Sequence, residues 1–269
     1  MNKLNINIKI PKNVSKKTAA AFFLKNGFKE LVQESSDRKK NNMPDLNQTI
    51  PFTPQLIDLY RIYQFIILNK RTTVVEFGCG WSSAVIMAAL NKLHFKYHRQ
   101  IKNLRRKHPF ELIIVDSEKK YIKIAKKRIN LFCKKRLKYK TICTQSRMTT
   151  FNGRICTEYK KLPLVNPDFI YLDGPGQEDS LGLQCGINVK HQDFMPMSCD
   201  ILKIENFLIP GTIILTDGRT ANARFLKNNF QRDWKYIYDK KNDQSIFILN
   251  EDPLGHVNKA QLNFYLNKI

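Results

Sequence analysis

The sequence predicts an α/β protein with a doubly wound, mainly parallel β-sheet, helices on both faces of that sheet, and an N-terminal helical extension. First, short apolar runs rich in β-branched residues alternate with segments of helical periodicity from residue 72 onward. Second, turn residues separate the runs from the helical segments. Third, a chain of 269 residues that is 42% hydrophobic can bury one large core. Strands that alternate with helices form a parallel sheet covered on both faces.

Six apolar runs are the predicted strands of this sheet. They cover residues 73–77, 112–115, 140–144, 169–172, 212–216 and 244–249. Parallel strands are joined by right-handed crossovers, and the ligands of such sheets bind at the carboxyl ends of the strands. The residues that directly follow each run are therefore the first candidates for a functional site.

Composition divides the chain into three parts. Residues 1–71 form the predicted extension, residues 72–250 the ligand-binding domain, and residues 251–269 a C-terminal tail. Within the extension, apolar and polar residues alternate over residues 1–12, which predicts a short strand. Residues 15–33 have a helical apolar pattern, and the polar residues 34–48 are typical of a linker.

Two further helices are expected on either side of the first predicted strand. Thr53-Pro54 opens a helix with proline at its first position, and Leu56, Leu59 and Tyr63 fall on one face of it. Residues 91–109 are rich in Lys, Arg and His and are too long for a minimal connection between two strands. They predict an inserted or extended basic helix, with solvated charge as its simplest explanation.

The formal net charge of the chain is +23. A nucleic acid, an anionic glycan or a membrane surface as partner would explain this charge electrostatically. Lys, Asn and Ile are abundant throughout the chain, however, so a general compositional bias explains the charge equally well. The charge alone therefore identifies no partner.

Cysteine spacing and hydropathy indicate the compartment. The six cysteines contain no Cys-x-x-Cys pair, which favours reduced thiols over disulfides or a zinc site. No uninterrupted run of about 18 apolar residues is present, and residues 1–12 lack the apolar core of a signal peptide. These observations predict a soluble, cytoplasmic protein without a transmembrane segment.

A glycine turn follows the first predicted strand, in the sequence Glu76-Phe77-Gly78-Cys79-Gly80-Trp81-Ser82-Ser83. Gly78 and Gly80 let the backbone turn sharply and approach a ligand, and the helix that begins near Ser82 offers free N–H groups. A Gly-x-Gly pair also occurs in dinucleotide-binding oxidoreductases, but their third glycine would stand at Ser83. A negative Glu76 would also repel a pyrophosphate.

Asp116 ends the second predicted strand and precedes a helix with an apolar stripe of Ile122, Ala125 and Ile129. A carboxylate at this strand tip can accept both hydrogen bonds of a ribose diol. Capping of the following helix is the alternative role, and the two are compatible. The spacing from the glycine turn exceeds the usual ~20 residues, which we attribute to the basic segment 91–109.

The fourth and fifth predicted strands each end in Asp followed by Gly. Asp173 and Asp217 are therefore expected close together at the reactive edge of the sheet. Asp-Gly is also a common turn pair, so a structural role is the alternative. The segment 177–202 between these strands is expected to cover a substrate site. His191 in this segment is a candidate base, with a surface histidine as the favoured interpretation. Arg219 and Arg224 could pair with a phosphate or carboxylate, and solvated charge explains them equally well.

The glycine turn resembles the Glu/Asp-x-Gly-x-Gly-x-Gly motif of class I S-adenosylmethionine-dependent methyltransferases, which have a Rossmann-like fold. Ser82 stands where the third glycine usually lies. The resemblance covers residues 72–249 and depends on the order of the glycine turn and the acids after three later strands. It implies S-adenosylmethionine as cofactor, bound by Glu76, Gly78, Cys79, Gly80, Ser82, Asp116 and Ser146, with Gln145 as another candidate beside the adenine.

The acids after the fourth and fifth strands resemble those of catechol-type O-methyltransferases, where they hold Mg²⁺. This resemblance implies Asp173 and Asp217 as catalytic residues and magnesium ligands. Gly218 stands where that family has Asn, and Asn222 is a replacement ligand only if the loop folds back. Without a metal, Asp173 would act directly as a general base.

The function expected from these residues is methyl transfer from S-adenosylmethionine to a hydroxyl of a small molecule or sugar, which can be anionic. A nucleic-acid methyltransferase that uses the basic surface is the enzymatic alternative, although the chain lacks the Asn/Asp-Pro-Pro-aromatic motif of amino-group methylation. A noncatalytic binding module of the same fold is another alternative, because a fold does not fix an activity. A dehydrogenase is the last.

Overall fold

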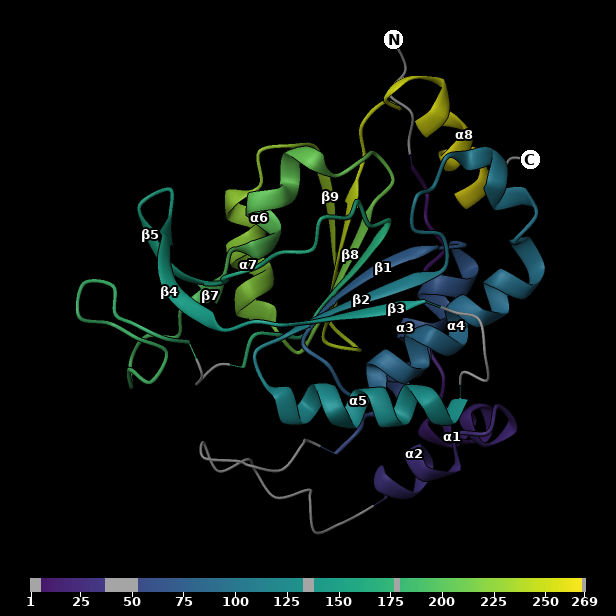
Figure 1. Cartoon of the computed structure of the whole chain (residues 1–269), viewed down its shortest axis with the longest axis horizontal. Helices are drawn as coiled ribbons and strands as arrows, with labels where there is room; N and C mark the ends of the chain where they lie inside the picture. Colours follow the sequence, from purple (N-terminus) through teal and green to yellow (C-terminus); the bar gives the residue numbers. More distant parts are fainter. Residues whose placement is uncertain (1–5, 37–52, 133–137, 177–179, 268–269) are drawn as a thin grey trace.

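A seven-stranded sheet forms the centre of the computed structural model, which describes residues 6–36, 53–132, 138–176 and 180–267. The strand order is β3-β2-β1-β6-β8-β10-β9 (Figure 1). In chain order the strands are β1 (Thr73–Phe77), β2 (Glu111–Asp116), β3 (Tyr139–Cys143), β6 (Phe169–Leu172), β8 (Ile213–Asp217), β9 (Trp234–Asp239) and β10 (Gln244–Leu249). The first five run parallel, and β10 is antiparallel to both of its neighbours.

Helices cover both faces of this sheet, which confirms the predicted fold class. On one face, α3 (Leu56–Leu68), α4 (Trp81–Tyr97), α5 (Lys119–Phe132) and α8 (Gly255–Tyr265) share a core with β1 and β2. On the other face, α6 (Asp200–Ile204) and α7 (Thr220–Asn229) pack against β6 and β8. Every residue of β1 and β2 is buried, as expected for central parallel strands.

A second, three-stranded sheet was not predicted. It consists of β4 (Ser146–Phe151), β5 (Arg154–Tyr159) and β7 (Met197–Ser198), in the order β4-β5-β7. The β4–β5 hairpin turns at Asn152 and Gly153, which have φ of 49° and 74°. Asn-Gly between two strands is the strongest short-range signal for a hairpin, so the sequence carried this information. β5 adds Cys156 and Tyr159 to the core beside α6 and α7.

The edge strand β9 was also not predicted. None of its six residues is buried, because β10 covers it on one side only and its faces are partly open to solvent. A strand of this kind lacks the continuous apolar run by which the central strands were recognised.

The N-terminal extension differs from expectation in two ways. Residues 6–15 form no strand; instead the Ile6 amide donates to Asn250 Oδ1, and Lys9 exchanges two hydrogen bonds with the Asn69 side chain. Side chains, rather than a neighbouring strand, therefore hold this segment. The single helix expected over residues 15–33 is divided into α1 (Lys16–Lys25) and α2 (Lys29–Glu34), because Gly27 between them has φ of +85°. Most of the predicted linker, residues 37–48, lies outside the described residues.

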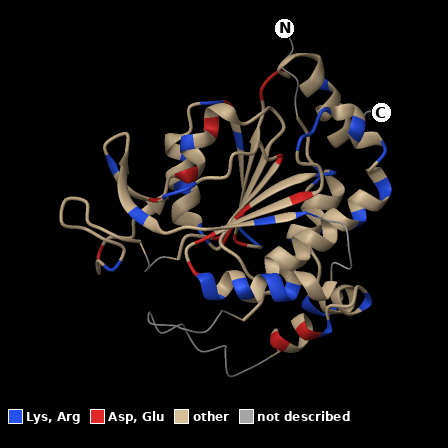
Figure 2. Cartoon of the chain, in the orientation of Figure 1, with Lys and Arg blue, Asp and Glu red and all other residues tan. Residues whose placement is uncertain are grey.

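The helices around β1 are close to prediction. α3 begins at Leu56 with Gln55 as its N-cap, so Pro54 precedes the helix instead of occupying its first position. The basic segment 91–109 extends α4 to Tyr97 and continues in the 3-10 helix η2 (Gln100–Leu104), which confirms an extended basic helix. Figure 2 shows Lys and Arg spread over the outer sides of α4 and α5. Among the described residues, none of the helices has the length and apolar character that crossing a membrane requires.

A buried carboxylate ties several segments together at the amino-terminal edge of the sheet. Asp168, just before β6, is 0% exposed and accepts hydrogen bonds from the Thr72 and Thr73 amides and from the Thr72 hydroxyl. It also accepts from the Tyr265 hydroxyl of α8 and lies 3.5 Å from the Arg106 guanidinium. This residue joins β1, β6, the segment before β2 and the C-terminal helix, so residues 255–265 pack on the chain's own core.

Replacing this carboxylate is expected to destabilise the whole fold. Asp168→Ala would leave the buried Arg106 and four donors without their partner, which we expect to cost about 3–5 kcal/mol of unfolding free energy. Urea unfolding of the variant measures this. The matched control is Asp193→Ala at an exposed acid, expected to stay within about 0.5 kcal/mol of wild type. Equal losses for both variants would contradict the assignment of Asp168.

Candidate functional site

Four loops meet at the carboxyl edge of the central sheet. Phe77 at the end of β1 pairs with Val115 of β2 on one side and Leu172 of β6 on the other, and Leu172 pairs with Thr216 of β8. The strand order reverses between β1 and β6, which is the switch point where open α/β sheets bind ligands. The structure therefore brings the loops of Gly78, Asp116, Asp173 and Asp217 together, as the sequence predicted.

Glu76 lies beneath the glycine turn and fixes it. The residue is 0% exposed, and its Oε2 accepts a 2.6 Å hydrogen bond from the Ser83 hydroxyl. The same hydroxyl accepts from the Gly80 amide at 3.4 Å. Burial raises the pKa of Glu76 to about 8, against the lowering effect of the serine hydroxyls. Its other oxygen, Oε1, is buried and has no hydrogen-bond partner among the described residues. Glu76 is therefore a positioning residue for the turn and is protonated for the most part at neutral pH.

Gly78 allows two loops to touch. It has φ of +92°, its amide donates to the Val115 carbonyl at 2.8 Å, and a Cβ added to it would lie 2.8 Å from the Asp173 carbonyl carbon. A Cβ on Gly174 would likewise lie 2.5 Å from the Gly78 nitrogen and 2.7 Å from the Tyr159 hydroxyl. Chain packing therefore requires glycine at both positions. The turn has this structural role in addition to its place in the site.

Gly80 differs from Gly78 because space is open beside it. A Cβ built there would meet only the Ser82 Oγ, at 3.9 Å. Gly80 is the N-cap of α4, so the first turn of that helix, with Ser82, faces the same space with its N–H groups. The part of the turn that can receive a ligand is therefore the stretch from Gly80 onward.

Asp116 borders this turn at the tip of β2. It is 7% exposed, and its Oδ1 accepts a 2.7 Å hydrogen bond from the Glu118 amide, so it does cap the start of the following segment. Burial raises the pKa of the half-buried Cys79 thiol, and the nearby Asp116 carboxylate raises it further. Cys79 and Asp116 are thus neighbours, which joins the first and second loops into one site.

Ser146, like Glu76, is a predicted cofactor residue whose side chain is fully buried. It opens β4, and its hydroxyl lies 2.8 Å from the Ser180 hydroxyl. Gln145 beside it is exposed and accepts from Lys160. The chain after β3 does pass the site, because the Thr144 amide donates to the Asp116 carbonyl. Contact of Ser146 with an adenine stays a prediction.

Asp173 lies at the tip of β6 with its side chain 48% exposed. Arg219 holds the loop around it: NH2 of Arg219 donates to the Asp173 carbonyl at 2.7 Å and to the Pro175 carbonyl at 2.9 Å. Desolvation raises the pKa of the Asp173 carboxyl, and the Arg219 charge opposes that shift. Asp173 is thus an accessible carboxyl on a backbone that a guanidinium keeps in place.

Asp217 is the neighbour of Asp173 but has a different environment. Burial raises the pKa of Asp217 to about 8, and the charge of Asp58 on α3 adds to this more than Asp173 does. Asp217 is therefore mostly protonated at neutral pH, whereas Asp173 faces solvent. Of the two predicted catalytic acids, Asp173 is the better placed to meet a substrate.

The residues present fit a magnesium ion poorly. Asn222, the expected replacement ligand, is 2% exposed, and both ends of its amide are bonded to the Ser198 backbone, so it is not available. Arg219 Nε lies 3.8 Å from Asp173 Oδ1, so the guanidinium already balances the charge of that carboxylate. No cluster of three or more His, Cys, Asp or Glu suited to a metal occurs in the part of the chain that the structure describes.

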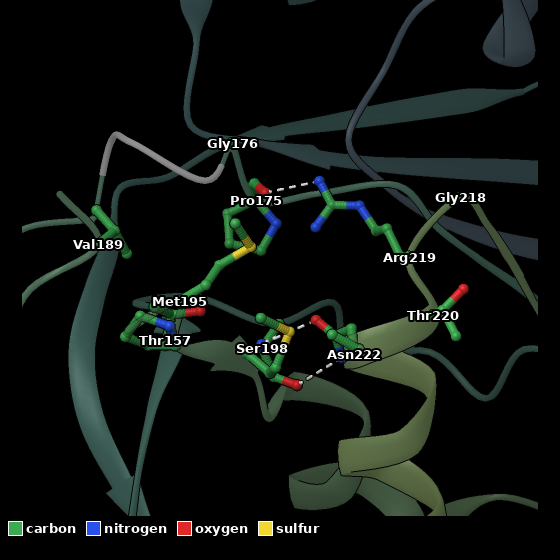
Figure 3. A pocket seen from close by; sticks show the side chains of 13 residues that line it. Thr157, Pro175, Gly176, Val189, Met195, Ser198, Gly218, Arg219, Thr220 and Asn222 are labelled. Carbon is green, nitrogen blue, oxygen red and sulfur yellow. Dashed lines mark hydrogen bonds between the residues drawn. The ribbon is translucent and has the colours of Figure 1, made fainter. Parts of the chain in front are cut away.

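A pocket of about 190 Å³ opens at the loop that follows Asp173 and reaches Pro175 and Gly176 (Figure 3). Pro175 and Gly176 form one side, β7 and the segment before it another, and the first turn of α7 the third. Part of the segment 177–202 therefore does line a cavity, through Val189, Met195 and Pro196. His191 is exposed, does not line the pocket and packs on Phe194, so it is a surface histidine.

Sequence reasoning missed three residues of this site. Ser83 was considered only as a substitute for glycine, although it links Glu76 to the turn. Tyr159 comes from the unpredicted hairpin, and its buried hydroxyl has no hydrogen-bond partner in the part of the chain that the structure describes. Arg219 was considered for an anion but not as the clamp of the Asp173 loop. The bond from Ser83 to Glu76 spans seven residues, and the bond from Arg219 to the Asp173 carbonyl spans 46, so neither role follows from a local sequence pattern.

Comparisons with known proteins concern architecture. No family model matches the chain, and no curated protein matches it. Similar solved structures include the O-methyltransferase TomG from Streptomyces achromogenes, 11% identical over 83% of this chain and 90% of that one, with a TM-score of 0.41. The methyltransferase PaMTH1 from Podospora anserina is 12% identical over 91% and 100%, with a TM-score of 0.42. An O-methyltransferase from Bacillus cereus is 12% identical over 88% and 93%, with a TM-score of 0.38.

The two glycine positions give a matched pair of substitutions. Gly174→Ala places a methyl 2.5 Å from the Gly78 nitrogen, where neither backbone can yield, so we expect a loss of at least about 2 kcal/mol of unfolding free energy. Gly80→Ala enters open space and is expected to cost about 1 kcal/mol or less, as a changed N-cap. Thermal and urea unfolding measure both. Similar stability of the two variants would show that the loop contact is dispensable.

The raised pKa of Glu76 predicts how stability depends on pH. The unfolded chain ionises this carboxyl near its ordinary value of 4.5, while the folded chain keeps it protonated up to about 8. The unfolding free energy should therefore fall as pH rises between these values, by up to a few kcal/mol at about 1.4 kcal/mol per unit. Glu76→Gln should flatten this fall and be more stable than wild type at pH 7. Parallel pH profiles of the two proteins would contradict the prediction.

Proposed function

We propose that this protein transfers a methyl group from S-adenosylmethionine to a hydroxyl of a small molecule. The observation that carries the proposal is the arrangement at the switch point. The open turn at Gly80 lies beside the Asp116 carboxylate, and the exposed Asp173 ends the neighbouring strand next to a pocket. A cofactor site and an acceptor site are thus adjacent on one edge of the sheet.

The residues around the turn fit such a cofactor. Gly80 leaves room for the chain of a ligand to pass close to the backbone, and the first turn of α4 presents N–H groups to a carboxylate. Asp116 at the tip of β2 is the acceptor for the ribose hydroxyls. Glu76 and Ser83 act indirectly, by keeping the Gly80 amide in place.

A dinucleotide is the less suitable ligand, although not for the electrostatic reason considered first. Glu76 is buried and mostly protonated, so it would repel a pyrophosphate little. Ser83, however, stands at the third glycine position of the dinucleotide fingerprint and is bonded to Glu76. In addition, the sheet ends in the antiparallel pair β10 and β9 instead of continuing in parallel.

The chain's own contribution to the reaction is positioning and proton removal. The bound cofactor supplies a methyl group already activated by its sulfonium. Asp173 is the group that accepts the proton of the acceptor hydroxyl, because its carboxyl is exposed at the strand tip and its loop continues into the wall of the pocket. Arg219 keeps the Asp173 loop in register, so that the hydroxyl and the methyl meet in line. No step requires a metal.

Calorimetric titration with S-adenosylhomocysteine tests this proposal. Wild-type protein is expected to bind S-adenosylhomocysteine and not to bind NADH. Asp116→Asn keeps an oxygen for the Glu118 amide but loses the charge that receives the ribose hydroxyls, so its affinity should fall at least about tenfold. Asp193→Asn, the same change at an exposed acid, should bind like wild type.

Addition of Mg²⁺ should change neither the affinity nor the rate with an acceptor. Absence of binding to wild type would favour a noncatalytic module, and binding of NADH alone would overturn the cofactor assignment. A steep loss of acceptor affinity with added salt would instead favour the nucleic-acid alternative, which the net charge of +23 suggests.

A further inference from the structure

Among the residues that the structure describes, thirteen line the pocket next to the Asp173 loop. Arg219 is the only one of these thirteen with an ionised side chain. Pro175, Val189, Met195, Pro196 and Met197 give the pocket apolar walls. On its floor, the Asn222 amide and the Ser198 backbone satisfy one another. The polar character that remains for a ligand therefore comes mostly from Arg219.

Arg219 uses only part of its hydrogen-bonding capacity within the protein. NH2 donates to two carbonyls, and Nε faces Asp173 at 3.8 Å. A guanidinium has five N–H donors, and the structure gives NH1 of Arg219 no partner among the described residues. Figure 3 shows the guanidinium at the upper side of the pocket, with one terminal nitrogen bonded to Pro175 and the other directed toward the space above Asn222.

The electrostatic surroundings allow an anion at NH1. Nε and NH2 already face the Asp173 loop, so NH1 is the part of the guanidinium turned away from that carboxylate. Asp217 is mostly protonated at neutral pH, since burial raises its pKa to about 8, and so adds little repulsion. The first turn of the ten-residue helix α7 also lines the pocket and contributes the positive end of its dipole.

We propose that this pocket binds the methyl acceptor through an oxyanion, a carboxylate or phosphate group, that Arg219 NH1 receives. This inference rests on the proposed function and names the class of its acceptor. The side chain is held on its other side and is 15% exposed, so the guanidinium is preorganised for a charge-assisted hydrogen bond. The acceptor hydroxyl is on the same molecule and faces Asp173.

The volume of the pocket limits the acceptor's size. A cavity of about 150 Å³ is enough for a benzene molecule, and this pocket measures about 190 Å³. It therefore admits one ring-sized group together with its anionic substituent. A polymer could enter only with a terminal unit. The bound acceptor is a small anionic hydroxy compound.

The test is an NMR titration of the ¹⁵N-labelled full chain, first loaded with S-adenosylhomocysteine. Inorganic phosphate and acetate are added in separate arms at constant ionic strength, and the amide signals of Gly176, Gly218 and Asn222 are followed. Wild type should show saturable shifts at these amides with at least one anion. Arg219→Gln should weaken the binding at least about tenfold, as expected for loss of hydrogen bonds to a charged group.

Arg224→Gln is the matched control, because it removes the same charge from an exposed position on the same helix. It should bind as wild type does. Shifts that do not saturate in wild type, or equal losses in the two variants, would overturn the proposal. The anion whose addition gives saturable shifts, phosphate or acetate, identifies the oxyanion as a phosphate or a carboxylate.

Two further readouts keep the outcomes separate. If Arg219→Gln does not fold, Arg219→Lys replaces it: loss of the planar fork should still weaken binding, and unchanged binding would contradict the role of NH1. Calorimetry with S-adenosylhomocysteine is run on the same samples. Failure to bind that ligand would count against the proposed function, whereas its binding without anion binding would count against this inference alone.

Discussion

The contact between the backbones at Gly78 and Gly174 is the constraint on which the site depends. No side chain fits at either position, because a Cβ at each would lie within 3 Å of the other loop. This contact sets the distance between the turn after β1 and the loop of Asp173. It also places the Tyr159 hydroxyl, Arg219 and the pocket around one point. In the proposed reaction, cofactor and acceptor can meet in line only if this spacing is kept.

Buried acids at the two edges of the sheet have opposite effects on stability. At the amino-terminal edge, Asp168 receives four donors besides the Arg106 charge and stabilises the fold. At the carboxyl edge, burial raises the pKa of Glu76 and of Asp217 to about 8, and no described residue bonds Glu76 Oε1. These groups lower stability near neutral pH. Such a concentration of unfavourable carboxyls at one edge is typical of a functional site.

Much of the fold was predictable because its signals are local. The central strands are continuous apolar runs, and three of the six predicted ranges coincide with β1, β6 and β10. The acids at the strand tips were also predictable, since carboxyl ends of parallel strands share an edge. The hairpin of β4 and β5 was missed, although the Asn152-Gly153 pair is a sequence signal for it. The strand β9 was missed because an edge strand has no continuous run of buried residues. The domain boundaries at residues 72 and 250 stay predictions.

The sequence by itself determined the sheet, the glycine turn and the set of acids, because periodicity and strand ends depend on neighbouring residues. Only the tertiary structure decided what each acid does. Burial beneath the turn makes Glu76 a positioning residue, the bonds of Asn222 to Ser198 remove it as a ligand, and the two carbonyls on NH2 leave NH1 of Arg219 for the pocket. These roles depend on desolvation and on partners distant in sequence, which no local pattern encodes.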